Sequence, residues 1–182
     1  MEKRTRVGFL NILSTCLLYG ISIITAPLFS RLLGTGGYGN VSNYNVWVSI
    51  LSITATLQTQ ATLANAMVEY PESLQDKYQS SVLSLSFLAF AVVSALILLF
   101  LNPISHALNL SKFFILLVLF QSIGTYGVNF MNRKLTYEMK AGRNMLLSLG
   151  TTLATLGLSL LFVLMLPQEL RYYGRIVAIA AV

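Results

Sequence analysis

Long uncharged stretches alternate with short polar segments along the whole chain. Each uncharged stretch is about as long as the ~20 residues that a helix needs to cross the hydrocarbon core of a membrane. The pattern predicts an all-α, polytopic integral membrane protein with five spanning helices and the start of a sixth, at residues 7–29, 41–68, 80–101, 113–131, 145–166 and 174–182. Because the last stretch stops within an apolar run, we expect the sequence to be an incomplete N-terminal transmembrane bundle, part of a longer protein.

The polar segment at the junction of the first two predicted spans, residues 30–45, joins them and includes the start of the second, and it is rich in glycine and asparagine. Glycine tolerates the positive φ angles that tight turns require. The glycines of this segment therefore predict a short hairpin in which the backbone reverses within a few residues. Arg31 precedes them, and its long aliphatic stem allows the guanidinium to reach the membrane interface.

Polar side chains recur at helical spacing inside several predicted spans. In the first span they are mainly hydroxyls, at Thr15, Ser22 and Thr25, and favour helix packing. The second and fourth spans carry amides, which are costly to expose to lipid because nothing there hydrogen-bonds them. Two interpretations stay open for these amides, namely contacts between packed helices or the lining of a cavity for a polar substrate. The candidate lining residues are Asn45, Gln58, Gln60, Gln121 and Asn129.

Composition agrees with a membrane protein, with 55% hydrophobic and only 10% charged residues. The basic residues predict the orientation. With a cytoplasmic N-terminus, the inner segments hold Lys3, Arg4, Arg6, Lys77, Arg133, Lys134, Lys140 and Arg143, and the outer segments hold Arg31, Lys112, Arg171 and Arg175. The positive-inside rule therefore favours this orientation. Topology accounts for the net charge of +6, and nucleic acid is not an expected partner.

The sequence offers little chemistry for catalysis. Its acidic residues and its single histidine, His106, fall at the ends of predicted spans or in loops. A membrane-embedded hydrolase or metal site needs paired carboxylates, or histidines at ligand spacing. We therefore expect no enzyme activity, no metal site and no cofactor. Cys16, the only cysteine, lies in an apolar run and is expected to be a small packing residue.

One segment carries a resemblance to a known family. The sequence SRLLGTGGYG at residues 30–39, after a basic N-terminus and one span, resembles the polysaccharide biosynthesis membrane proteins, the group that exports O-antigen and teichoic acid. The matching residues are Ser30, Arg31, Leu32, Leu33, Gly34, Tyr38 and Gly39. The basic segment at 130–150 and the sequence YGRIVAIAA at 173–181 are also similar to parts of that family.

The resemblance implies a flippase for lipid-linked oligosaccharides, in the superfamily that includes the multidrug and toxin extrusion transporters. Such proteins have about twelve to fourteen helices in two bundles, which alternately open a central cavity to either side of the bacterial cytoplasmic membrane. The implied partners are a polyprenyl-phosphate-linked oligosaccharide, membrane lipids, and the glycosyltransferases and polymerase of the same pathway. Two alternatives stay open: a multidrug or metabolite antiporter of the same superfamily, and a non-catalytic membrane subunit of envelope polysaccharide synthesis.

The cavity of such transporters is cationic, which matches the phosphates of the carrier. No arginine lies at the middle of a predicted span. The candidate phosphate-attracting residues are therefore Arg31, Arg133 and Lys134. For the basic cluster that includes Arg133 and Lys134, the other interpretation is that it sets topology and contacts anionic headgroups.

Overall fold

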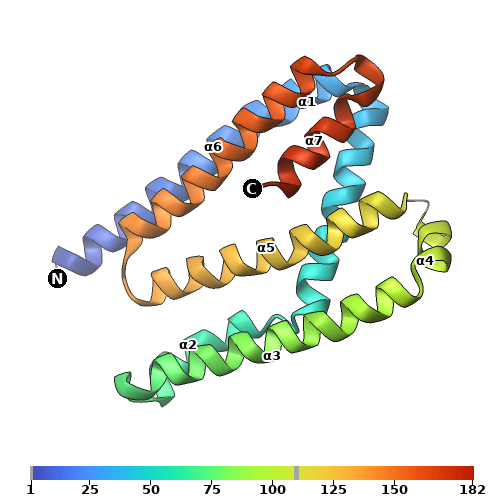
Figure 1. Cartoon of the computed structure of the whole chain (residues 1–182). Helices are drawn as coiled ribbons and strands as arrows, with labels where there is room; N and C mark the ends of the chain where they lie inside the picture. Colours follow the sequence, from blue (N-terminus) through green and yellow to red (C-terminus); the bar gives the residue numbers. More distant parts are fainter. Residues whose placement is uncertain (1, 109–110) are drawn as a thin grey trace. The chain divides into compact units, whose positions relative to one another are not determined.

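The computed structural model describes residues 2–108 and 111–182, which are mostly helical and contain no strand (Figure 1). The long helices are α1 (Glu2–Ala55), α3 (Glu72–Leu99), α5 (Lys112–Tyr137) and α6 (Ala141–Met165). The short elements are the 3₁₀ turn η1 (Thr59–Thr62), α2 (Leu63–Glu69), α4 (Leu101–Leu108), the 3₁₀ turn η2 (Gln168–Leu170) and α7 (Arg171–Ala180). Within the described residues, four helices are long and apolar enough to cross a membrane. The all-α polytopic membrane fold predicted from the sequence is confirmed.

Helix α1 takes in the first predicted span and much of the second, and it changes direction at Gly34 (Figure 1). Gly34 has φ 69° and ψ 171°, a backbone conformation that glycine adopts without a steric penalty. Among the described glycines it is the only one with a positive φ. The expected hairpin is therefore a turn made at one residue. The polar residues 35–40, which the sequence placed between the first two predicted spans, are helical.

The described chain divides into two compact units. The first unit contains residues 2–45 and 138–182, and so the first part of α1 with α6 and α7. Helix α7 packs against α6, and the two helices approach closely at Gly174. A Cβ atom on Gly174 would lie 2.6 Å from Leu166 Cδ1 and 3.1 Å from Phe162 Cβ. Because Gly174 has no side chain, the backbone of α7 can pack directly against the side chains of Phe162 and Leu166.

The second unit contains residues 46–137, that is, the last turns of α1 followed by η1 and helices α2 to α5. Its buried core is formed by Leu63, Val82, Tyr126 and Phe130, which come from α2, α3 and α5. The packing of α2 against α3 and α5 holds the end of the second predicted span inside this unit.

The second predicted span, residues 41–68, does not form one helix. Helix α1 ends at Ala55, and Leu57 and Gln58 follow with φ angles of 54° and 45°. The backbone N–H of Gln58 donates to the carbonyl of Ile53, which closes the helix end. The chain then continues into η1 and α2. A left-handed conformation costs roughly 1–2 kcal/mol for a residue with a side chain. Surrounding contacts must stabilise this break, because no glycine or proline occurs there.

Candidate functional site

The first unit contains a cavity of about 280 Å³ between α1, α6 and α7. Most of its lining side chains are polar, although the helices that form it are apolar. The lining residues are Ile21, Ser22 and Thr25 of α1, Thr151, Thr152, Thr155 and Leu156 of α6, and Arg175 of α7. The threonines of α6 lie at the middle of that helix, which is long enough to span the membrane. The cavity therefore places polar groups beside the middle of a helix that is long and apolar enough to cross a membrane.

The hydroxyls of the cavity are oriented by their own helices. Ser22 donates to the carbonyl of Leu18 at 2.9 Å, and Thr155 donates to that of Thr151 at 2.8 Å. Thr152 likewise donates to the carbonyl of Ser148 at 2.7 Å. With their protons engaged by the backbone, these oxygens keep lone pairs that accept hydrogen bonds. A lining of this kind suits a ligand that carries hydroxyl or amide donors.

Arg175 supplies positive charge to the cavity. Its guanidinium carbon lies 3.4 Å from the ring centroid of Phe29, a side chain that is only 1% exposed. The ring face attracts the cation and holds it in place. The Nη1 atom of Arg175 is buried and has no hydrogen-bond partner in the part of the chain that the structure describes. Arginine inside a membrane protein is costly unless it meets an anion or water, so this side chain marks a candidate ligand site.

Two features of α7 position Arg175. The close packing of Gly174 on α6 fixes the residue that follows it. One turn earlier, Arg171 donates from Nη1 to the carbonyl of Leu32 at 3.3 Å and from Nε to that of Leu166 at 3.4 Å. Arg171 thereby satisfies carbonyls next to the Gly34 turn and at the end of α6. Arg171 thus links α7 to α1 and to the end of α6 by hydrogen bonds, and Arg175 lines the cavity.

In the second unit, three buried hydroxyls hold the helix break at residues 56–58. The Thr59 hydroxyl is hydrogen-bonded to Ser86 and lies 2.9 Å from the Tyr126 hydroxyl. The oxygens of Ser86 and Tyr126 are 2.6 Å apart. Ser86 and Tyr126 lie near the midpoints of α3 and α5, so the break is at mid-depth along these two spanning helices. Discontinuous helices at this depth form substrate sites in many transporters.

Comparison with known proteins gives the family of the chain. The sequence profile described as "Polysaccharide biosynthesis protein" matches residues 5–182. The chain belongs to this polysaccharide biosynthesis protein family. The resemblance seen at residues 30–39 is thereby confirmed. No curated protein and no solved structure matched the sequence.

Two amides predicted from the sequence lie at the helix break of this polysaccharide biosynthesis protein. Gln58 is exposed in its left-handed conformation, and Gln60 is 8% exposed within η1. The Oε1 atom of Gln60 is buried, and no described residue hydrogen-bonds it. The break thus brings together the exposed amide of Gln58 and the buried amide of Gln60, whose oxygen is an open acceptor. Beside them lies the Thr59 hydroxyl cluster, which consists of the hydroxyls of Thr59, Ser86 and Tyr126.

The other predicted amides are not part of η1 or of the residues 56–58 that break the helix. Asn45 and Asn129 are exposed, on α1 and α5 respectively. Gln121 is half-buried on α5, and its Oε1 atom has no hydrogen-bond partner within the described chain. The fully buried residues of α5 include Ser122 and Tyr126, which belong to a neighbouring face of that helix. The face of α5 that carries Gln121 and Asn129 therefore lies at the edge of the core of the second unit, and the residues of α5 that form the core lie on the neighbouring face.

The three predicted basic residues do not line the Arg175 cavity. Arg31 is exposed on α1, and Arg133 is half-buried near the end of α5. Lys134 Nζ lies 3.8 Å from a carboxylate oxygen of Asp76, at the surface. The sequence prediction counted Arg175 with the outer segments, at the start of the sixth predicted span, and did not include it among the phosphate-attracting residues. The apolar run IVAIA after Arg175 was a signal that this arginine belongs to a helix, but it does not tell which neighbouring helix the side chain faces.

Proposed function

We propose that this family member moves a lipid-linked oligosaccharide or polysaccharide precursor across the bacterial cytoplasmic membrane. It does so by alternating access, as a transporter and not as an enzyme, with its N-terminus in the cytoplasm. Membership of the polysaccharide biosynthesis family and the apolar helices support this function. The observation that carries it is Arg175, a cation with an open buried donor in a hydroxyl-lined cavity.

The chemistry of the cavity matches both parts of such a substrate. A guanidinium has five N–H donors arranged to bind phosphate oxygens in pairs, and it stays charged at any physiological pH. The phosphate or pyrophosphate that joins the glycan to its carrier is an anion of this kind. The threonine hydroxyls around Arg175 accept hydrogen bonds from sugar hydroxyls, which are donors.

The helix break offers a second set of sugar-binding groups. In the proposal, Gln58 and Gln60 bind sugar hydroxyls, because a primary amide presents both donors and acceptors to them. The open Oε1 atom of Gln60 supports this role, since a buried acceptor without a partner is costly unless a ligand or water satisfies it. Glycosyltransferases would supply the lipid-linked substrate on the inner side, and a polymerase or ligase would consume it on the outer side.

Depletion of the protein in its own host tests the function. Carrier-linked glycan is extracted after spheroplasts are treated with a membrane-impermeant reagent that modifies only outer-leaflet sugars. Depletion is expected to raise the protected, inner-leaflet pool and to lower the surface polymer. Accumulation of the modified, outer-leaflet pool would instead place the protein after translocation. An unchanged leaflet distribution with normal surface polymer would overturn the proposal.

A further inference from the structure

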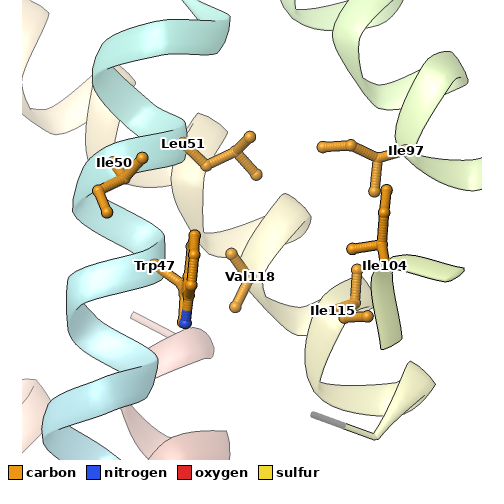
Figure 2. Close-up of a pocket in the computed structure, with 7 residues that line it drawn as sticks. All are labelled: Trp47, Ile50, Leu51, Ile97, Ile104, Ile115 and Val118. Carbon is orange, nitrogen blue, oxygen red and sulfur yellow. The ribbon is translucent and has the colours of Figure 1, made fainter. Parts of the chain in front are cut away.

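The second unit contains another cavity, of about 270 Å³, with a different character. The lining residues that the structure describes are all apolar: Trp47, Ile50 and Leu51 of α1, Ile97 of α3, Ile104 of α4, and Ile115 and Val118 of α5. Figure 2 shows Leu51 and Val118 on one side of the space, with Ile97 and Ile104 on the other. Apart from the indole N–H of Trp47, these side chains offer a polar ligand no hydrogen-bond partner. The cavity therefore suits a hydrocarbon.

The depth of this cavity follows from the Thr59 hydroxyl cluster. Ile97 lies about three helical turns from Ser86 along α3, and Ile115 lies the same distance from Tyr126 along α5. Three turns of helix rise roughly 16 Å, which is about half the ~30 Å thickness of the hydrocarbon core. Since Ser86 and Tyr126 lie near the helix midpoints, the cavity is at the boundary between hydrocarbon and headgroups. In the expected orientation this is the outer leaflet.

Two further features agree with a boundary position. Helix α4 is a short helix that places Ile104 in the cavity and leaves Asn102 and His106 exposed, as expected for a helix lying along the membrane surface. Trp47, the only tryptophan of the sequence, lines the cavity, and tryptophan is enriched at membrane–water interfaces. A hydrocarbon chain whose headgroup lies at the interface can enter the cavity from that side.

We propose that this cavity binds the isoprenoid chain of the carrier lipid, at the isoprene units next to its phosphate. The inference rests on the proposed function. A hydrocarbon chain that fills a space of this size gains packing contacts with the side chains around it and so stabilises the unit. The flat indole of Trp47 and the branched side chains opposite fit the planar, methyl-branched units of an isoprenoid better than a straight acyl chain. The protein would hold the carrier there while its glycan reaches the outer surface.

Fluorescence of Trp47 tests the assignment, because this chain has no other tryptophan. The chain is placed in lipid nanodiscs with small amounts of polyprenyl phosphate that carries a nitroxide quencher near its phosphate. Phosphatidylcholine with the nitroxide at the same depth is the comparison lipid. We expect a saturable loss of Trp47 emission with the isoprenoid, at concentrations where the phospholipid causes none. Ile97→Phe, which fills the cavity, is expected to abolish this saturable loss.

Leu98→Phe is the matched control, since it adds the same ring to a neighbouring α3 residue that is 50% exposed and does not line the cavity. It is expected to retain isoprenoid-specific quenching. Ile104→Phe gives a second filled variant if Ile97→Phe lowers thermal stability. Equal quenching by both lipids, or no quenching by either, would overturn the assignment. The two experiments can also disagree. If quenching is specific for the isoprenoid but depletion of the protein leaves the leaflet distribution of carrier-linked glycan unchanged, the proposed function is overturned and the isoprenoid site is not.

Discussion

Removing the Tyr126 hydroxyl tests whether the buried hydroxyl cluster holds the helix break in place. The Tyr126 oxygen is 2.9 Å from Thr59 Oγ1 and 2.6 Å from Ser86 Oγ, so Tyr126→Phe loses two side-chain hydrogen bonds. The Tyr126 ring is fully buried and would keep its packing. Hydrogen bonds between membrane helices contribute about 0.6 kcal/mol on average and up to about 1.7 kcal/mol. The substitution is expected to cost about 1–2 kcal/mol.

The loss should be local, because the cluster ties η1 and α2 to α3 and α5. A change of 1–2 kcal/mol alters an opening equilibrium by roughly 5- to 30-fold. Hydrogen exchange in detergent or nanodiscs, read by mass spectrometry on peptides covering residues 59–69, should accelerate by that factor. Peptides of α6, which belongs to the other unit, serve as the internal reference and should exchange at the wild-type rate.

Tyr78→Phe is the matched control, since Tyr78 packs against the same core and contacts the Tyr70 ring at a centroid distance of 5.2 Å. Its hydroxyl is not part of the Thr59 cluster. Equal exchange at 59–69 in the two variants would show that the hydroxyls do not hold the break. Acceleration that extends equally to α6 would also refute the reasoning, because it would mean a global loss of stability.

Three further substitutions test other parts of the structure. Gly174→Ala should lower the free energy of unfolding by about 1–3 kcal/mol relative to Gly157→Ala, because overpacking a buried site costs that much. Gly157 is the control, since an added Cβ meets no atom within 4 Å there but meets several at Gly174. Gln60→Met should leave the unfolding midpoint unchanged or higher, since it removes an unsatisfied buried acceptor, yet it should reduce transport. Asp76→Asn should change the free energy of unfolding by less than about 0.5 kcal/mol, as expected for an exposed pair with Lys134, because the Asp76 side chain is 88% exposed.

The fold class was predictable because hydropathy and length determine which segments can cross a membrane. The break at residues 56–58 was not. Its sequence, TLQ, contains no glycine or proline, and its left-handed residues are held by hydroxyls from α3 and α5 that are distant in sequence. At Gly34 the sequence indicated a turn correctly, but the flanking glycines are helical, because glycine permits a positive φ without requiring one.

The candidate site was predictable only in part. Amide spacing drew attention to Gln58 and Gln60, and the structure places both at the break. Ser22 and Thr25, which the sequence favoured as packing residues, instead line the Arg175 cavity. Arg175 itself was missed, because an apolar run of a few residues after an arginine does not reveal which helix the arginine will face. Only the packing of α7 on α6 decides that.

The central claim is that Arg175 binds the anionic part of a translocated lipid-linked glycan. It is tested most directly by the leaflet distribution of that lipid in strains that carry Arg175→Gln or Arg175→Lys on the chromosome, at matched protein levels. Arg143→Gln, the same change at an exposed arginine of α6, is the control. We expect Arg175→Gln to trap the lipid in the inner leaflet, Arg175→Lys to translocate part of it, and Arg143→Gln to match the wild type. Wild-type translocation by Arg175→Gln would contradict the claim.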